Sequence, residues 1–253
     1  MATMHLVTNT LRLPVVVAIL TTASMNTSYA DNFIVGVENI DYFPIYQYKD
    51  GQYNGAASEI LNQFAKSHNH TFSYKAFPIT RLNKNYLNGK VDFRFPDNGY
   101  WAQDQKAGFD IKYSSSVIEF IDGVMVTPEN KGKGVAQLKK LGLVRGFTAW
   151  DYLDYIKKGS VKVKETNSLE SLIKLTKTKR YDGAYFNVDV ARYYLNNTLK
   201  TPEAIVFDPD LPHTKSNYSL SSFKHPKIIV QFNQFLIDQA DWVQTVKNKY
   251  QVK

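Results

Sequence analysis

Strand-like and helix-like segments alternate along this chain from residue 31 onward, and the alternation runs through two successive series. The first series has apolar, strand-like runs at 33–37, 71–76 and 91–95. A helix-like stretch follows the first run, with apolar residues at helical spacing (Ala57, Ile60, Leu61, Phe64 and Ala65). A second helix-like stretch covers 80–88 and ends before Gly89. This alternation predicts an α/β fold with largely parallel sheets.

The second series repeats the pattern and predicts a second lobe. Its strand-like runs lie at 141–144, 161–163 and 182–186, and its helix-like stretches at 148–156, from 167 onward, and at 188–195. Helices at 226–237 and 241–250 close the chain. Extended segments at 117–127 and 204–207 flank the second series, and we interpret them as two crossovers that form a hinge. We therefore predict one lobe from 31–122 with 208–253, an inserted lobe from 123–207, and a ligand cleft between them.

Residues 1–30 have the features of a cleaved secretory signal peptide. Arg12 is their only charged residue, an apolar run covers 13–20, and small residues at Ser28 and Ala30 predict cleavage after Ala30. Removing this segment lowers the net charge from +8 to +7. The apolar run is too short to span a bilayer. We expect a periplasmic protein without a lipid anchor, because no cysteine follows the cleavage site.

The composition excludes several classes of function. The chain has no cysteine, which removes disulfides, thiolate nucleophiles and Cys-ligated zinc. Its positive charges are spread along the sequence, so we expect a solvated basic surface and no nucleic-acid partner. His68 and His70 are two residues apart, a spacing that does not place both on one helix face. We expect no metal and no cofactor.

The order of motifs resembles the amino-acid type of bacterial periplasmic solute-binding protein, family 3 of the extracellular solute-binding proteins. No single motif is specific, but their order over the mature chain is. The stretches that carry the resemblance are 34–61, 81–93, 141–153, 167–195 and 225–250. The resemblance implies a type II two-lobed fold. It also implies a monomer that closes on a small molecule and delivers it to an ABC-type transporter through a membrane permease.

Candidate site residues in the first lobe are aromatic or cationic. Tyr42, Phe43 and Tyr46 follow the first strand, where ligands sit in open α/β sheets. Aromatic faces bind apolar or cationic groups. Arg81 opens a helix and offers a planar fork for a carboxylate. Each residue also has a structural alternative. The aromatic rings could pack the loop, and Arg81 could form an ion pair on the surface.

Candidate site residues in the second lobe surround two helix starts. Thr148 follows a glycine before a helix, so its hydroxyl and the free N–H groups predict an anion site, or simple capping. Arg145 adjoins that turn. In the family that the chain resembles, the residue five after the strand's Asp commonly holds the ammonium of an amino acid. Counted from Asp182, that residue is Asn187, and Asp189 either substitutes for it or caps the helix.

A second departure from the family concerns its Thr-x-x-Arg turn, whose Arg binds an α-carboxylate. The corresponding stretch has no such turn and offers instead Asp97, Asn98, Tyr100 and Trp101. We therefore expect a ligand other than a standard α-amino acid in the usual pose. Both a cationic or ring-containing solute and an acid fit these residues.

Two other functions share this fold in the family that the chain resembles. One is a sensor partner of a membrane receptor, which the sequence does not separate from a transport protein. The other is a dehydratase-like enzyme, for which the carboxylates near the predicted cleft are Glu38, Asp97 and Asp189. We expect a binding protein and no enzyme activity.

Overall fold

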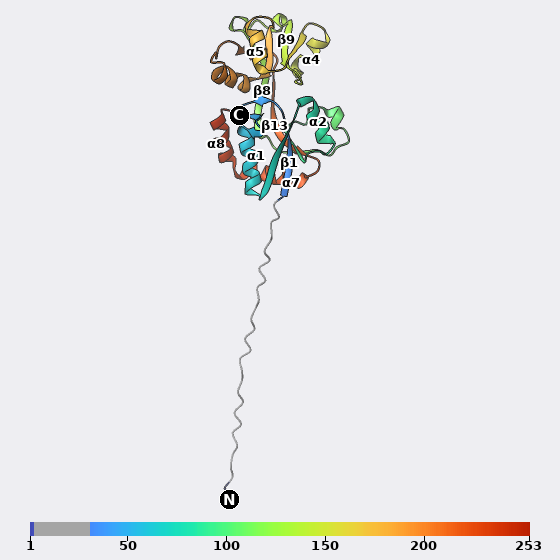
Figure 1. Ribbon diagram of the computed structural model, residues 1–253, viewed down its shortest axis with the longest axis vertical. Coiled ribbons are helices and arrows are strands. Elements are labelled where there is room, and N and C mark those ends of the chain that lie inside the picture. Colours follow the sequence, from blue (N-terminus) through green and yellow to red (C-terminus); the bar gives the residue numbers. More distant parts are fainter. Residues whose placement is uncertain (3–30) are drawn as a thin grey trace.

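The computed structural model describes residues 1, 2 and 31–253 and has two lobes, one above the other in Figure 1. The signal-peptide prediction falls almost wholly on residues outside this range. Strands β8 (Ile118–Val126) and β13 (Thr214–Ser222) connect the lobes. One path of strands, β10-β9-β11-β8-β13-β6-β1-β5, runs through both lobes. The predicted α/β class is confirmed.

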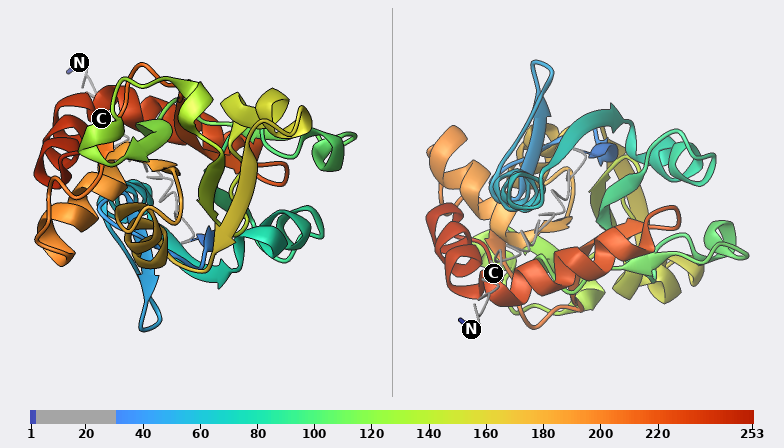
Figure 2. Two further views of the ribbon diagram at one scale, coloured as in Figure 1. Left: turned by 90° about the horizontal axis from the view of Figure 1, so that it is seen from above. Right: turned by 90° about the horizontal axis from the view of Figure 1, so that it is seen from below.

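The first lobe is built on three parallel strands, and β1 lies between the other two. β13 adds an antiparallel edge beside β6. A three-stranded sheet, β2-β3-β4, includes a hairpin that projects from the body (Figure 2). The strands and helices of this lobe are β1 (Asp31–Glu38), β2 (Asp41–Tyr42), β3 (Tyr46–Lys49), β4 (Gln52–Asn54), α1 (Ala56–Ser67), β5 (His70–Phe77), α2 (Ile79–Leu87), β6 (Phe93–Asp97), α3 (Gln103–Lys106), β7 (Lys112–Tyr113), α7 (Pro226–Asp238) and α8 (Ala240–Tyr250).

The second lobe contains parallel strands β10, β9 and β11, with β8 antiparallel to β11. Its elements are the 3₁₀ turns η1 (Pro128–Asn130), η2 (Val135–Gln137) and η3 (Trp150–Tyr152), β9 (Lys140–Val144), α4 (Leu153–Lys157), β10 (Lys162–Thr166), α5 (Leu169–Lys177), β11 (Gly183–Asn187), α6 (Val188–Tyr193), the π-helical turn η4 (Tyr194–Thr198) and β12 (Val206–Phe207).

The second connection between the lobes differs from the predicted one. The predicted crossover at 204–207 contains β12, which pairs with β8 inside the second lobe. The strand that crosses is β13, whose first half pairs with β8 and whose second half pairs with β6. β13 is rich in Ser, Thr and Asn, so its sequence lacks the apolar signal of a buried strand. The lobe boundaries at 122/123 and 207/208 stay predictions.

Apolar side chains at the predicted spacings form the core of the first lobe. On α1, the five residues of the predicted apolar face are all buried. They pack beneath the sheet with Phe33, Val35 and Val37, which alternate along β1. The start of α5 differs by one residue from the prediction, because the Ser168 side chain, and not Asn167, accepts the capping hydrogen bond from the Ser171 N–H at 3.2 Å.

Candidate functional site

A cavity of about 340 Å³ lies between the two lobes and is bordered by both connecting strands. β1 and β5 end at the cleft, which is where an α/β sheet presents its ligand-binding residues. The lining residues come from the first lobe (Glu38, Tyr46, Ile79, Thr80, Asn83, Arg94, Trp101, Ala102 and Gln105), the connecting strands (Asp122 and Tyr218) and the second lobe (Gly146, Phe147, Thr148 and Trp150).

The lobes touch each other at one rim of this cavity. A Cβ atom added to Gly146 would lie 3.2 Å from the Cβ of Ile79, and Gly146 has a φ of +97°. Nearby, the ring of Phe147 stacks on Tyr42 of the first lobe, with centroids 5.8 Å apart. A Cβ at this position would crowd Ile79, and the left-handed φ also favours glycine.

Glu38 is the acidic group at the end of β1. It is 5% exposed, and its Oε2 accepts a hydrogen bond of 2.6 Å from the Tyr46 hydroxyl. Burial raises the pKa of Glu38, whereas the Tyr46 hydroxyl and the charge of Arg94 lower it. Tyr46 is held in turn by stacking on Tyr42, with centroids 4.9 Å apart.

Arg94 is a buried cation in β6 that borders the cavity. Its Nη1 donates to Asn83 Oδ1 at 2.8 Å and lies 3.4 Å from Asp97 Oδ1. Asn83 in turn donates to Gln105 Oε1 at 2.8 Å. The Nε of Arg94 is enclosed without a hydrogen-bond partner in the described part of the chain. The guanidinium is therefore held in place and still has an N–H group that is free to donate a hydrogen bond.

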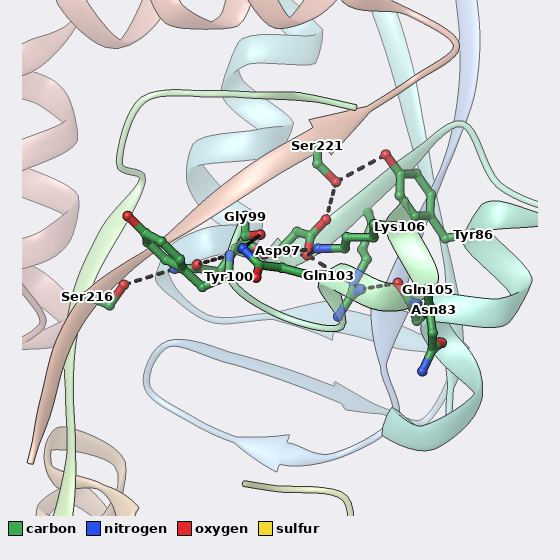
Figure 3. A network of polar contacts seen from close by, with 12 residues as sticks. Asn83, Tyr86, Asp97, Gly99, Tyr100, Gln103, Gln105, Lys106, Ser216 and Ser221 are labelled. Carbon is green, nitrogen blue, oxygen red and sulfur yellow. Dashed lines mark hydrogen bonds and ion pairs between the residues drawn. The ribbon is translucent and has the colours of Figure 1, made fainter. Parts of the chain in front are cut away.

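Asp97 is the centre of the buried polar network that holds Arg94 (Figure 3). It is fully buried, and its Oδ1 accepts from Lys106 Nζ at 2.7 Å. Its Oδ2 accepts from Ser221 Oγ at 2.6 Å. Burial lowers the pKa of Lys106, and the charge of Asp97 opposes that shift. Asp97 therefore pairs two cations and does not border the cavity.

Asp122 is an acidic residue on connecting strand β8. It borders the cavity directly, and its Oδ1 has no hydrogen-bond partner within the described residues. Burial raises the pKa of Asp122 to about 7; the Asn187 side chain lowers it, and the charges of Glu38 and Asp151 raise it further. Asp151 accepts a very short hydrogen bond from the Thr214 hydroxyl of β13.

Of the predicted site residues, Tyr46, Trp101 and Thr148 border the cavity. The segment around Thr148 differs from the prediction, because the chain turns helical only at Trp150 and no side chain caps that turn. Thr148 therefore reaches the cavity from a loop and not from a helix start.

Four predicted residues lie directly behind the cavity wall. Tyr42 is fully buried and supports Tyr46. Asp97 belongs to the network described above. Asn98 is buried, and its Nδ2 donates to Ser216 Oγ and to the Asn217 carbonyl, both at 2.9 Å. Asn187 is fully buried, and its Oδ1 accepts from two N–H groups of α6. These residues position the site and do not line it.

The remaining predicted residues are placed away from the cavity. Phe43 packs against Tyr193 and Tyr250 on another face. Arg81 is exposed on α2, and Tyr100 is 77% exposed. The side chains of Arg145 and Asp189 form ion pairs with Glu165 at 3.4 Å and Arg192 at 3.2 Å. In this structure none of these five contributes to the cavity wall.

Sequence reasoning missed several lining residues, above all Arg94 and Asp122. Each is a charged residue inside an apolar strand, in the stretches "VDFRF" and "EFIDGV". A charge in such a run was a usable signal, because charged groups are buried only where they find partners or a function. Three aromatic lining residues were also missed, because an aromatic residue in the sequence is as consistent with a hydrophobic core as with a cavity wall. They are Phe147, Trp150 and Tyr218.

Comparison with solved structures identifies the fold. The chain superposes on a periplasmic binding protein of an arginine transport system from Legionella pneumophila with a TM-score of 0.68 and 13% identity, over 87% of this chain and 100% of that one. An ABC uptake transporter substrate-binding protein from Streptococcus pneumoniae with bound histidine superposes with a TM-score of 0.68 and 17% identity, over 87% of this chain and 92% of that one. The chain has the type II periplasmic-binding-protein fold.

A third solved structure with this fold is a ligand-binding core. The ligand-binding core of GluR0 in complex with L-glutamate matches with a TM-score of 0.69 and 17% identity, over 88% of this chain and 99% of that one. No protein-family model and no curated protein matches the sequence. Within residues 1, 2 and 31–253, no helix combines the length and apolarity needed to cross a bilayer.

Proposed function

We propose that this protein binds a small solute in the cavity between its lobes and delivers it to an ABC-type membrane transporter. One observation carries the proposal: Arg94 and Asp122, which border a cavity that both lobes and both connecting strands share, each have an enclosed polar atom without a hydrogen-bond partner in the described residues. Buried charges without full partners are costly unless a ligand completes them. The solved structures with the same fold include a periplasmic binding protein of an arginine transport system and an ABC uptake transporter substrate-binding protein with bound histidine.

The pose of the solute differs from that in the amino-acid binders that the sequence resembles. Asn187 occupies the position of their ammonium-binding acid, and its Oδ1 is used by the N–H groups of Asp189 and Val190, each at 3.0 Å. Arg94 provides a guanidinium at the cavity, but from strand β6 and not from the turn after it. A standard α-amino acid would therefore have to bind in a different orientation.

The proposed location is the periplasm, reached by cleavage after Ala30, and the proposed state is a monomer. Intact-mass analysis of the protein from a periplasmic extract should give a chain that begins at Asp31. A retained N-terminus, or a protein confined to the cytoplasm, would contradict the location. Size-exclusion chromatography with light scattering should give the mass of one chain.

Solute binding is tested by thermal denaturation with a panel of amino acids, amines, organic acids and small peptides. A solute at about 100 times its dissociation constant stabilises the folded state by roughly 2.7 kcal/mol, which is a measurable rise in melting temperature. Small-angle scattering should then show a smaller radius of gyration with the same solute. Unchanged melting across the panel would count against the proposal.

A receptor partner is a second candidate for delivery, because the GluR0 ligand-binding core shares the fold. Reconstitution separates the two roles: a transport protein stimulates ATP hydrolysis by its permease complex, and a receptor partner does not. Asp122, with a pKa raised by burial to about 7, also meets one requirement of a general acid or base. Turnover of the bound solute during incubation would favour the enzyme alternative.

A further inference from the structure

The carboxylate that is missing at position 187 is present on the neighbouring strand. β8 and β11 are antiparallel, and Asp122 is the register partner of Asn187. Asn187 is fully buried and its Oδ1 caps α6, whereas Asp122 is of intermediate burial as a residue, has an enclosed Oδ1 and borders the cavity. The two strands thus carry an amide and an acid side by side, and the acid is the one that borders the cavity.

We propose that the solute carries a positively charged group and that Asp122, on the connecting strand, binds it. This inference rests on the proposed function, since it assumes that the cavity is the solute site. It goes beyond that proposal because it fixes the charge of the solute and the residue that recognises it.

The charges around the cavity favour a cation. Within the described residues, Arg94 and Lys106 are the two buried Lys or Arg side chains, and Asp97 pairs with both. Glu38 is a further acid close enough for the charge of Arg94 to lower its pKa. The two cations, Arg94 and Lys106, balance the two acids, Asp97 and Glu38. An ionised Asp122 therefore adds a negative charge that no cation in this network compensates. A cationic group of the solute would supply the missing partner.

The walls of the cavity suit an organic cation and not a bare metal ion. Rings from both lobes and from β13 border the same space as Asp122, and aromatic faces attract ammonium and guanidinium groups. These rings are Tyr46, Trp101, Phe147, Trp150 and Tyr218. The Trp101 and Tyr218 rings meet edge to face, with centroids 5.9 Å apart. Within the described chain, no three His, Asp or Glu side chains are grouped to hold a metal ion.

Binding of a cation is coupled to release of a proton from Asp122. The acids near it are Glu38 and Asp151, and both charges raise its pKa further above the ordinary value. The hydroxyls that interact with it are those of Tyr42, Tyr185 and Tyr218, whose pKa values burial raises, so they stay neutral. A bound cation favours the ionised carboxylate, and the proton passes to solvent. The affinity for a cation should therefore rise with pH up to about 7 and then level off.

Matched pairs of probes that differ by one positive charge test this inference. The pairs are butylguanidinium with butylurea, and choline with 3,3-dimethylbutan-1-ol, and glutarate, which carries no ammonium group, serves as an anionic probe. We expect the cation of at least one pair to bind at least tenfold more tightly than its neutral partner. A carboxyl with a pKa near 7 predicts that this affinity increases about tenfold between pH 6 and pH 8.

Two variants locate the effect. Asp122→Asn should weaken cation binding at least tenfold and abolish its dependence on pH, because the amide keeps the shape and loses the charge. Asp189→Asn is the matched control, since Asp189 is an acid near the same strand end whose side chain pairs with Arg192 away from the cavity. It should leave both properties unchanged. Wild-type pH dependence provides a test that does not depend on either variant folding.

The outcomes separate the inference from the proposed function. A neutral partner that binds as tightly as its cation, a cation affinity that is flat between pH 6 and pH 8, or full affinity in Asp122→Asn would overturn the role of Asp122. Binding of glutarate or of a neutral probe with no cation bound would also overturn it and leave the proposed function standing. Failure of every probe in this set and in the wider panel would overturn both.

Discussion

Removal of the Asp97 carboxylate is the perturbation whose effect the structure predicts most fully. Asp97 is fully buried and pairs with Lys106 and Arg94, whose side chains are each 6% exposed. Asp97→Ala leaves both buried cations without their ion-pair partner, and breaking such a pair costs about 3 to 5 kcal/mol. In a chain of this size that corresponds to a melting temperature lower by roughly 10 °C.

The assay is chemical denaturation of the wild type and the variants, followed by circular dichroism. Asp110→Ala is the control, because Asp110 and its partner Lys112 are 83% and 50% exposed, and such surface pairs contribute about 0 to 1 kcal/mol. Lys106→Met in the Asp97→Ala background removes one of the two unpaired cations and should restore part of the loss. A loss below about 1 kcal/mol for Asp97→Ala, or no recovery in the double variant, would refute the reasoning.

Three further predictions concern the cavity and the contact between the lobes. Arg94→Gln should weaken binding of a solute identified in the panel, whereas Arg81→Gln, on the exposed face of α2, should leave its affinity unchanged in calorimetric titration. Gly146→Ala should weaken solute binding and keep the radius of gyration large in scattering, because the added Cβ crowds Ile79 of the other lobe. Gly132→Ala is the control for backbone strain alone, because Gly132 has a φ of +77° and an added Cβ would have no atom within 4 Å. Asp122 should make the folded protein lose stability as the pH rises from about 4 to about 7 and level off above, since the folded protein keeps a proton on this carboxyl that the unfolded chain has released. Asp122→Asn should reduce this loss in denaturation measurements.

The sequence predicted the parts of the fold that depend on local periodicity. The apolar spacing on α1 and the alternation along β1 identified those elements, and both are buried as expected. β13 was not predicted as the second connecting strand, because its polar sequence has no apolar pattern typical of a buried strand. Its position depends on pairing with β8 and β6, which are distant in the sequence. Register across a sheet is a tertiary property that a single strand does not reveal.

Predictions of the site were weaker for the same reason. Tyr46 and Trp101 lie in segments that lead into the cleft, and they border the cavity. Tyr100 and Arg145 come from such segments too, but the direction of a loop side chain depends on its tertiary neighbours, and both face solvent. Arg94 was overlooked because the partners that make a buried arginine tolerable come from other segments of the chain.

Tryptophan fluorescence tests most directly the claim that a solute binds between the lobes. The chain has three tryptophans, and two of them, Trp101 and Trp150, border the cavity from opposite lobes. The third, Trp242, lies on α8 and packs near Phe235, so Trp242→Phe leaves only the cavity reporters. We expect a saturable change in emission from this variant, with the same dissociation constant as the rise in melting temperature. A solute that raises the melting temperature and leaves this emission unchanged would place binding elsewhere and contradict the account.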